Sequence, residues 1–94
     1  MNGRYLLRNG DELRLSKEGV ELAGIRHPLE RVKGATARVL SRGMSIDVAG
    51  ASLRLEFTDP KTREAAMEAL AKLLGGKVLR RGKSPWARID VQKA

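Results

Sequence analysis

The hydrophobic pattern of this 94-residue chain changes its period once, after residue 57, and that change limits the folds the chain can adopt. Up to that point apolar and polar residues alternate in short runs such as "ELRLS" (12–16) and "LRLEF" (53–57). Such alternation is typical of β-strands that bury one face. The runs are short and closely spaced, and segments such as "NGD" (9–11) separate them. Such segments predict tight turns, because Asn and Gly accept a positive φ. We therefore predict a mainly β (α+β) fold, a small antiparallel β-barrel or sandwich of about six to seven strands.

The residues after the change of period predict one amphipathic helix over 59–74, which closes the β-structure. Asp59 or Thr58 can cap the first free amides of this helix, and Pro60 suits its first position. Gly75 and Gly76 end it, because glycine adopts the left-handed conformation at low cost. The apolar stripe expected to face the core consists of Ala66, Met67, Leu70, Leu73 and Leu74.

The composition is that of a globular domain, with 41% hydrophobic and 32% charged residues. Because there is no cysteine, the chain can form neither a disulfide nor a thiolate zinc site. No apolar run approaches the ~20 residues of a membrane span, and the N-terminal sequence lacks the apolar block of a signal peptide. We therefore expect a cytoplasmic protein without integral membrane association.

Positive charge is concentrated at the C-terminal end of the chain. The sequence has 19 basic and 11 acidic residues, a net charge of +8. Residues 1–75 hold 13 basic and 10 acidic side chains, whereas residues 76–94 hold 6 and 1, a net charge of +5. This asymmetry favours a polyanionic partner. We divide the chain into a β-structure with its helix (1–75) and a basic C-terminal extension (76–94) that can form a β-hairpin.

The stretch "LRRGKSPWARID" (79–90) is the candidate binding segment, because it surrounds the single tryptophan with cations. Cations neutralise phosphates, and a planar ring can stack on a base. The predicted nucleic-acid or anion-binding residues are Lys77, Arg80, Arg81, Lys83, Trp86 and Arg88. In the alternative, Trp86 packs in the core and the arginines form a solvated rim. The size and apolarity of tryptophan favour that burial.

Three stretches resemble the pleckstrin-homology-like (PH-like) superfamily, in particular its small bacterial and GRAM-type members. "DELRLSKEGVELAG" (11–24) resembles the strand, glycine turn and strand that open such domains, and "HPLERVKGA" (27–35) resembles their short proline-containing segment. "LRLEFTDPKTREAAMEALAKLL" (53–74) is similar to their last strand and the C-terminal helix that plugs the barrel. The resemblance implies a PH-like β-barrel over residues 1–75. It also implies a non-catalytic platform, which binds phosphoinositides in some members and proteins in others.

No arrangement of residues indicates catalysis. His27 is the only histidine and has no partner at metal-ligand spacing, so a structural role is favoured. No serine lies in a nucleophile-elbow motif, and "GGK" (75–77) follows a helix, whereas a phosphate loop precedes one. We therefore predict no enzymatic activity, no cofactor and no metal site.

Together these features predict a non-enzymatic binding module that engages an anionic partner, with nucleic acid favoured, through its basic C-terminal segment. The alternative is a PH-like adaptor that binds a protein, for example an acidic protein surface, through an edge strand or the helix. Anionic lipid ranks below both, because Asp11 and Glu12 occupy the first hairpin, where lipid-binding members have a basic cluster. A homodimer formed by exchange of the C-terminal hairpin also remains open.

Overall fold

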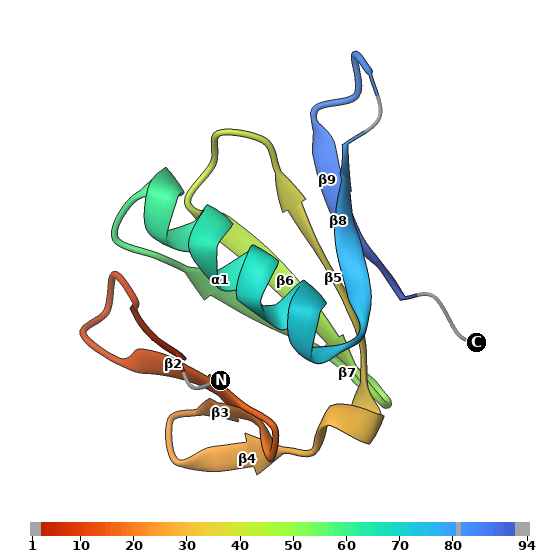
Figure 1. Cartoon of the computed structure of the whole chain (residues 1–94). Helices are drawn as coiled ribbons and strands as arrows, with labels where there is room; N and C mark the ends of the chain where they lie inside the picture. The colour runs from red at the N-terminus through yellow and green to blue at the C-terminus, as the bar shows by residue number, and fades with distance from the viewer. Residues whose placement is uncertain (1–2, 81, 92–94) are drawn as a thin grey trace.

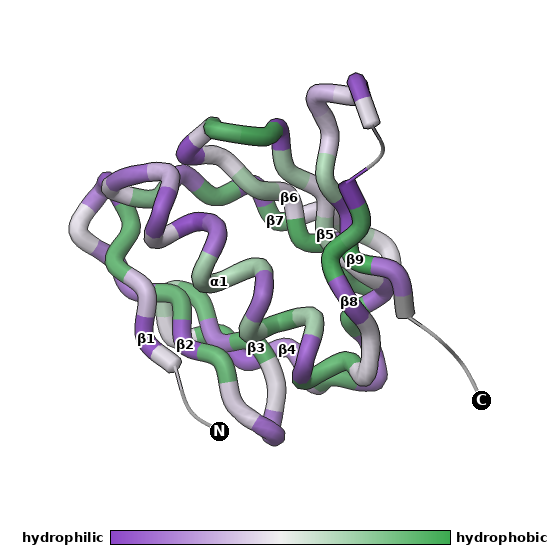
Figure 2. Tube along the Cα trace, turned by 45° about the horizontal axis from the view of Figure 1, so that its top comes forward, coloured by the Kyte–Doolittle hydropathy of each residue, from purple (hydrophilic) through white to green (hydrophobic). Residues whose placement is uncertain are grey.

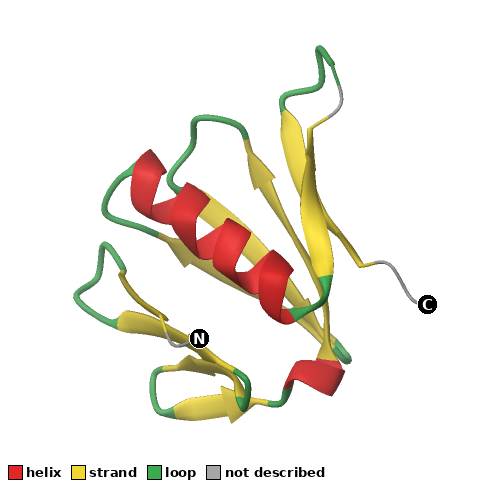
Figure 3. Ribbon diagram, viewed as in Figure 1, coloured by secondary structure: helices red, strands yellow, loops and turns green. Residues whose placement is uncertain are grey.

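The first of two antiparallel sheets is a meander in which each strand pairs with the next (Figure 1). The computed structural model describes residues 3–80 and 82–91, and its two sheets and single α-helix confirm the mainly β fold (Figure 3). The order of the first sheet is β1-β2-β3-β4. Its strands are β1 (Gly3–Leu6), β2 (Glu12–Ser16), β3 (Gly19–Leu22) and β4 (Ile25–His27).

Tight turns join these strands, and specific residues stabilise them. Between β1 and β2, the Asn9 side-chain oxygen accepts a hydrogen bond from the Asp11 amide at 3.0 Å, as the "NGD" signal predicts. Gly19 opens β3 with a φ of +138°, and a Cβ there would lie 2.1 Å from the His27 carbonyl oxygen. The chain therefore requires glycine at this position.

The second sheet combines strands from before and after the helix in the order β7-β6-β5-β9-β8. A 3-10 turn (Leu29–Arg31) leads into it from the first sheet. An isolated bridge between Leu7 and Phe57 links the two sheets, which do not close into a barrel. The strands of the second sheet are β5 (Val32–Arg38), β6 (Gly43–Val48), β7 (Ala51–Glu56), β8 (Gly76–Arg80) and β9 (Trp86–Val91).

The helix α1 (Pro60–Leu73) begins and ends close to the positions predicted from the sequence. The Asp59 carboxylate accepts a hydrogen bond from the backbone amide of Thr62 at 2.7 Å, and this bond lowers the pKa of Asp59. Gly75 follows the helix with a φ of +72°. In the described residues, no helix combines the length and apolarity that crossing a membrane requires.

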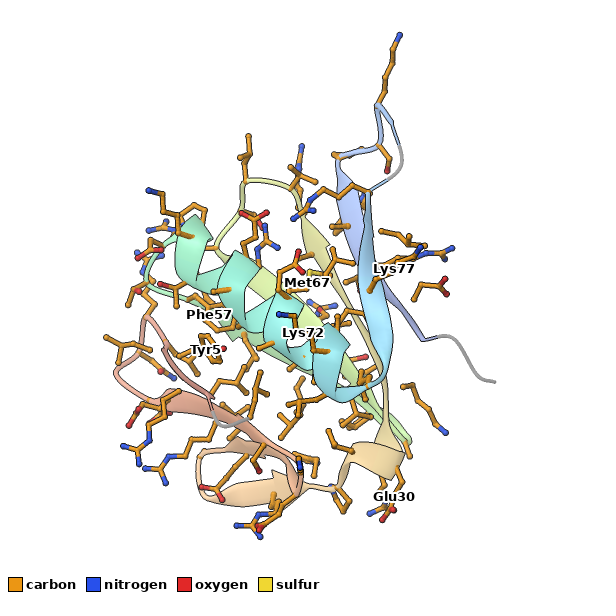
Figure 4. The ribbon with its side chains drawn as sticks, viewed as in Figure 1. Tyr5, Glu30, Phe57, Met67, Lys72 and Lys77 are labelled. Atoms are coloured by element: carbon orange, nitrogen blue, oxygen red, sulfur yellow. The ribbon has the colours of Figure 1, made fainter. Side chains whose placement is uncertain are left out.

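The core lies between α1 and the two sheets, because α1 packs against β1 and β2 as well as β6, β8 and β9. Phe57 and Met67 are fully buried there, and Figure 4 shows both on the inner side of the molecule. The predicted apolar stripe is confirmed at three positions, while Leu73 and Leu74 are only partly buried. The buried residues of the helix are Arg63, Ala66, Met67, Leu70 and Ala71.

Candidate nucleic-acid interface

The five-stranded sheet has one face covered by α1 and one open face. The side chains that point toward the helix are buried: Ala35, Ala37, Met44, Ile46, Val48, Leu55, Ala87 and Ile89. The residues between them point the opposite way and are exposed or half-buried, because successive side chains of a strand alternate between faces. We use the name open face for the surface formed by Thr36, Arg38, Ser45, Arg54, Trp86 and Arg88.

Strand register aligns four polar side chains in one row across the open face. Arg54 of β7 lies opposite Ser45 of β6, Ser45 lies opposite Thr36 of β5, and Thr36 lies opposite Arg88 of β9. Because neighbouring strands are about 4.8 Å apart, the backbone positions of Arg54 and Arg88 are separated by roughly 14 Å. The row therefore has one arginine near each end and small hydroxyl side chains between them.

Trp86 and Arg38 form the next cross-strand pair on this face. They are direct partners between β9 and β5, a geometry that places Cβ atoms about 5 Å apart. Trp86 is 56% exposed, so the expectation that it packs in the core is wrong. The reason is its phase within β9: the helix side of this strand is taken by Ala87 and Ile89, which are buried.

A shallow depression of about 440 Å³ lies on the open face between Arg54 on one side and Arg38 with Trp86 on the other. Its lining includes Gly43 and Ser45, the small residues that β6 presents to this face. The neighbouring strands β5 and β7 present long arginine side chains. The depression therefore follows from the difference in side-chain size between β6 and its neighbours.

Among the described residues, Arg8, Arg14, Arg26, Arg42 and Arg80 form ion pairs, and the other arginines, which include the three of the open face, do not. Within the described residues, Arg38, Arg54 and Arg88 form no ion pair shorter than 4.0 Å. The nearest acid along β7, Glu56, is bound instead by Arg8 at 2.8 Å. The three guanidinium groups are therefore free to bind an external anion without breaking an internal pair.

On this side of the sheet Glu56 lies at the end that holds Trp86, where it is paired with Arg8 and Arg42, and two further acidic side chains lie toward the other end. Asp47 accepts a hydrogen bond from the Ser52 hydroxyl at 3.0 Å, and Asp90 lies opposite Lys77 in the pairing of β8 and β9. Figure 4 labels Lys77 on β8. The sheet thus has a basic end, which contains Trp86, and a mixed end, so an anion is attracted to the basic end.

The predicted binding residues are divided between two sides of the sheet. Trp86 and Arg88 belong to the open face, with Lys77 at its mixed end, whereas Lys83 is exposed in the turn between β8 and β9. The remaining two are Arg80, which lies on the helix side opposite the buried Ala87, and Arg81, which lies outside the described residues.

Arg80 is neutralised by the helix. Its guanidinium forms an ion pair with Glu64 of α1 and lies 3.9 Å from the carboxylate of Glu68. The charge that the sequence analysis assigned to one segment is therefore partly compensated by the protein itself. We leave Arg80 out of the candidate interface for this reason.

Arg38 and Arg54 are functional candidates that lie far from the basic C-terminal segment in the sequence. Alternation along "LRLEF" (53–57) places Arg54 on the outer side of its strand, whereas alternation along "ATARVL" (35–40) leaves open whether the face with Arg38 or the face with Ala37 is the outer one. That signal does not tell which strand lies beside which. The pairing of β5 with β9, about fifty residues apart in the sequence, brings Arg38 to Trp86.

A buried arginine fixes the loop that follows β5. Arg63 of α1 is 3% exposed, and its Nε donates a hydrogen bond to the Ser41 carbonyl oxygen at 3.2 Å. Burial lowers the pKa of Arg63, but a guanidinium remains charged at neutral pH. The Val39 amide also donates to the Pro85 carbonyl oxygen at 2.6 Å, so this loop is bound to both the helix and the start of β9. The edge of the open face beside Trp86 is thereby held in place.

The β5–β6 loop and the β8–β9 turn differ in character. Figure 2 shows an apolar stretch in the β5–β6 loop, where Leu40 is 83% exposed with a φ of +66°, and hydrophilic residues at the tip of the turn.

His27 is half-buried at the end of β4. In the part of the chain that is described, no three His, Cys, Asp or Glu side chains gather closely enough to hold a metal ion.

Comparison with protein-family models, with curated proteins and with solved structures finds no match to this chain.

Proposed function

We propose that this chain is a non-enzymatic nucleic-acid-binding module and that it binds through the open face of the five-stranded sheet. The observation that supports the proposal is the grouping of three arginines without ionic partners in the described residues around a half-exposed tryptophan. Guanidinium groups bind phosphate oxygens, and an exposed indole ring offers a surface on which bases stack. The net charge of +8 adds long-range attraction for a polyanion.

The proposal moves the binding site from a segment of sequence to a face of the sheet. Three strands that are separated in the sequence supply the residues of the site: β7 supplies Arg54, β5 supplies Arg38, and β9 supplies Trp86 and Arg88. Lys83 and Lys77 flank this site, since one lies in the adjoining turn and the other further along β8. A partner that runs across the strands of the sheet contacts all three arginines of the open face at once.

We also propose that the fold is a variant of the PH-like architecture. The order of elements supports this: a four-stranded meander, three further strands, and a helix that packs against both sheets. The strands β8 and β9 then widen the second sheet beyond β5. An experimental structure that superimposes on PH-like domains over residues 3–73, with β8 and β9 as an addition, is the expected result.

The test of function compares two triple variants that remove the same charge from different places. One carries Arg38→Ala, Arg54→Ala and Arg88→Ala on the open face. The matched control removes three arginines that form internal ion pairs: Arg14, Arg26 and Arg80. Binding of fluorescein-labelled oligonucleotides is measured by anisotropy at low salt, after circular dichroism has shown that both variants fold.

We expect the open-face variant to lose at least about tenfold in affinity, because it loses direct phosphate contacts. The control is expected to change affinity only about two- to threefold through its lower net charge. Equal losses in both variants would refute the assignment of the site. Failure of the wild-type protein to bind any oligonucleotide, together with binding to a protein partner that depends only weakly on salt, would favour the adaptor function instead.

A further inference from the structure

We infer that the open face binds single-stranded rather than duplex nucleic acid, with one base stacked on Trp86 and its neighbour in the adjoining depression. The inference rests on the proposed function, since it specifies the ligand of the same site. Three features of the face support it: the position of the ring, the shape beside it, and the spacing of the cations.

The ring of Trp86 can be used only by an unpaired base. Trp86 belongs to a strand in the interior of the sheet, between β5 and β8, and is 56% exposed. A base within a duplex is covered on both faces by its neighbours and presents only its edges in the grooves. A single strand can turn a base outward and lay its face on the indole.

The depression beside Trp86 suits a flat polar ligand. About 440 Å³ of space lies over the small residues of β6, and Thr36 and Ser45 bring hydroxyl groups into its lining. A hydroxyl both donates and accepts hydrogen bonds, so it can pair with the edge of any base. The guanidinium of Arg54 borders the same space and supplies donors only.

The arginine spacing matches a short run of phosphates. Arg54 and Arg88 are separated by roughly 14 Å across three strand spacings, with Arg38 one row further along. Phosphates along one strand of B-DNA are about 3.4 Å apart along the axis, and a strand with its bases turned outward is more extended, so this distance corresponds to at most roughly four nucleotides. The face therefore predicts a footprint of up to about four nucleotides that runs across the strands.

A duplex would have to use another part of the molecule. Major grooves admit an α-helix or a two-stranded β-ribbon. The exposed side of α1 carries Glu64 and Glu68 as well as Lys61 and Lys72, so the charges of the helix balance and it offers phosphates no excess of positive charge. The β8–β9 turn projects beyond the rest of the sheet (Figure 1), and its tip includes Lys83. Duplex binding would therefore depend on Lys83 and leave Trp86 unused.

The experiment compares a 12-nucleotide single strand, as DNA and as RNA, with the 12-base-pair duplex of the same sequence. Trp86 is the only tryptophan, so its fluorescence reports directly on the site. We expect both single strands to bind at least tenfold more tightly than the duplex and to quench this emission. The variant Trp86→Ala should weaken single-strand binding by about 5- to 150-fold, whereas Trp86→Phe, which keeps an aromatic face, should retain most of it.

The outcomes separate this inference from the proposed function. If the duplex binds as tightly as the single strand without quenching Trp86, and if Lys83→Ala weakens that binding, the inference is wrong while nucleic-acid binding stands. If no oligonucleotide binds, both are wrong. Equal loss of single-strand affinity in Trp86→Ala and Trp86→Phe would also contradict stacking, provided that both variants keep the circular dichroism spectrum of the wild type.

Discussion

Replacing Arg88 by alanine should reduce the salt dependence of nucleic-acid binding, whereas the same change at Arg80 should not. The two residues lie on adjacent strands of one hairpin but on opposite sides of the sheet. Arg80 is already paired with Glu64, so it has no charge to offer a phosphate without breaking that pair. Arg88 has no ionic partner in the described residues.

The expected magnitude follows from the number of phosphates bound. Each contact to a single strand contributes about 0.7 to the slope of log K against log salt, so Arg38, Arg54 and Arg88 together give about −2.1. Raising the salt concentration from ~50 to ~200 mM should then weaken wild-type binding about 18-fold. Without Arg88 the slope should fall to about −1.4 and the loss to about 7-fold.

Anisotropy titrations at four salt concentrations measure these slopes for wild type, Arg88→Ala and Arg80→Ala. The account predicts that Arg80→Ala keeps the wild-type slope, since removing an exposed ion pair changes stability by only ~0–1 kcal/mol and leaves the open face intact. Equal decreases in slope for both variants would refute the reasoning, because they would show that binding responds to overall charge rather than to one face.

Three further predictions concern the structure that positions this face. Gly19→Ala should destabilise the protein by roughly 3 kcal/mol in urea unfolding, because the new Cβ would clash with the His27 carbonyl; a loss below about 1 kcal/mol would contradict the geometry. Arg63→Met should cost about 1.5–3 kcal/mol, measured in the same way, since it leaves the Ser41 carbonyl without its charged donor; unchanged stability would show that this bond is dispensable. Asp59→Ala should lower the urea midpoint at pH 7 more than Asp59→Asn does. Because its pKa is lowered on folding, the Asp59 carboxylate stabilises the protein fully above its usual pKa. That contribution disappears as the pH falls through the lowered value, so the difference between wild type and Asp59→Asn should shrink in acid, whereas Asp59→Ala should stay less stable than both because it has no side-chain cap.

The sequence allowed the type and phase of most elements to be predicted. Alternation along "ELRLS" places Leu13 and Leu15 on one face, and both are buried. The cap at Asp59 and the glycine at position 75 mark the limits of the helix, because each supplies a local conformation that does not depend on the rest of the fold. Local signals of this kind can be read one segment at a time.

The burial of Arg63 could not be predicted from the sequence of the helix alone. Helical spacing alone includes this position on the inner side of α1, but a charged residue there is unexpected without a partner. Its partner is the carbonyl of Ser41, in a loop that follows β5. Only the folded arrangement of helix and loop reveals that hydrogen bond.

The candidate interface depends on strand order in the same way. Alternation along a strand separates Arg88 from the buried Ala87 and Ile89, but it does not show that β9 lies beside β5. That pairing places Trp86 next to Arg38, while the phase of β9 turns it away from the helix. A cluster of charges in the sequence therefore became two groups with different partners once the sheet was assembled.

Binding at the open face can be seen residue by residue in the amide chemical shifts during titration with a single-stranded oligonucleotide. We expect the shifts to concentrate on Thr36, Arg38, Ser45 and Arg88, together with the Trp86 indole, while the strands of the first sheet remain unchanged. Shifts concentrated on the first sheet or on the exposed side of α1, with the Trp86 indole unaffected, would contradict binding at the open face.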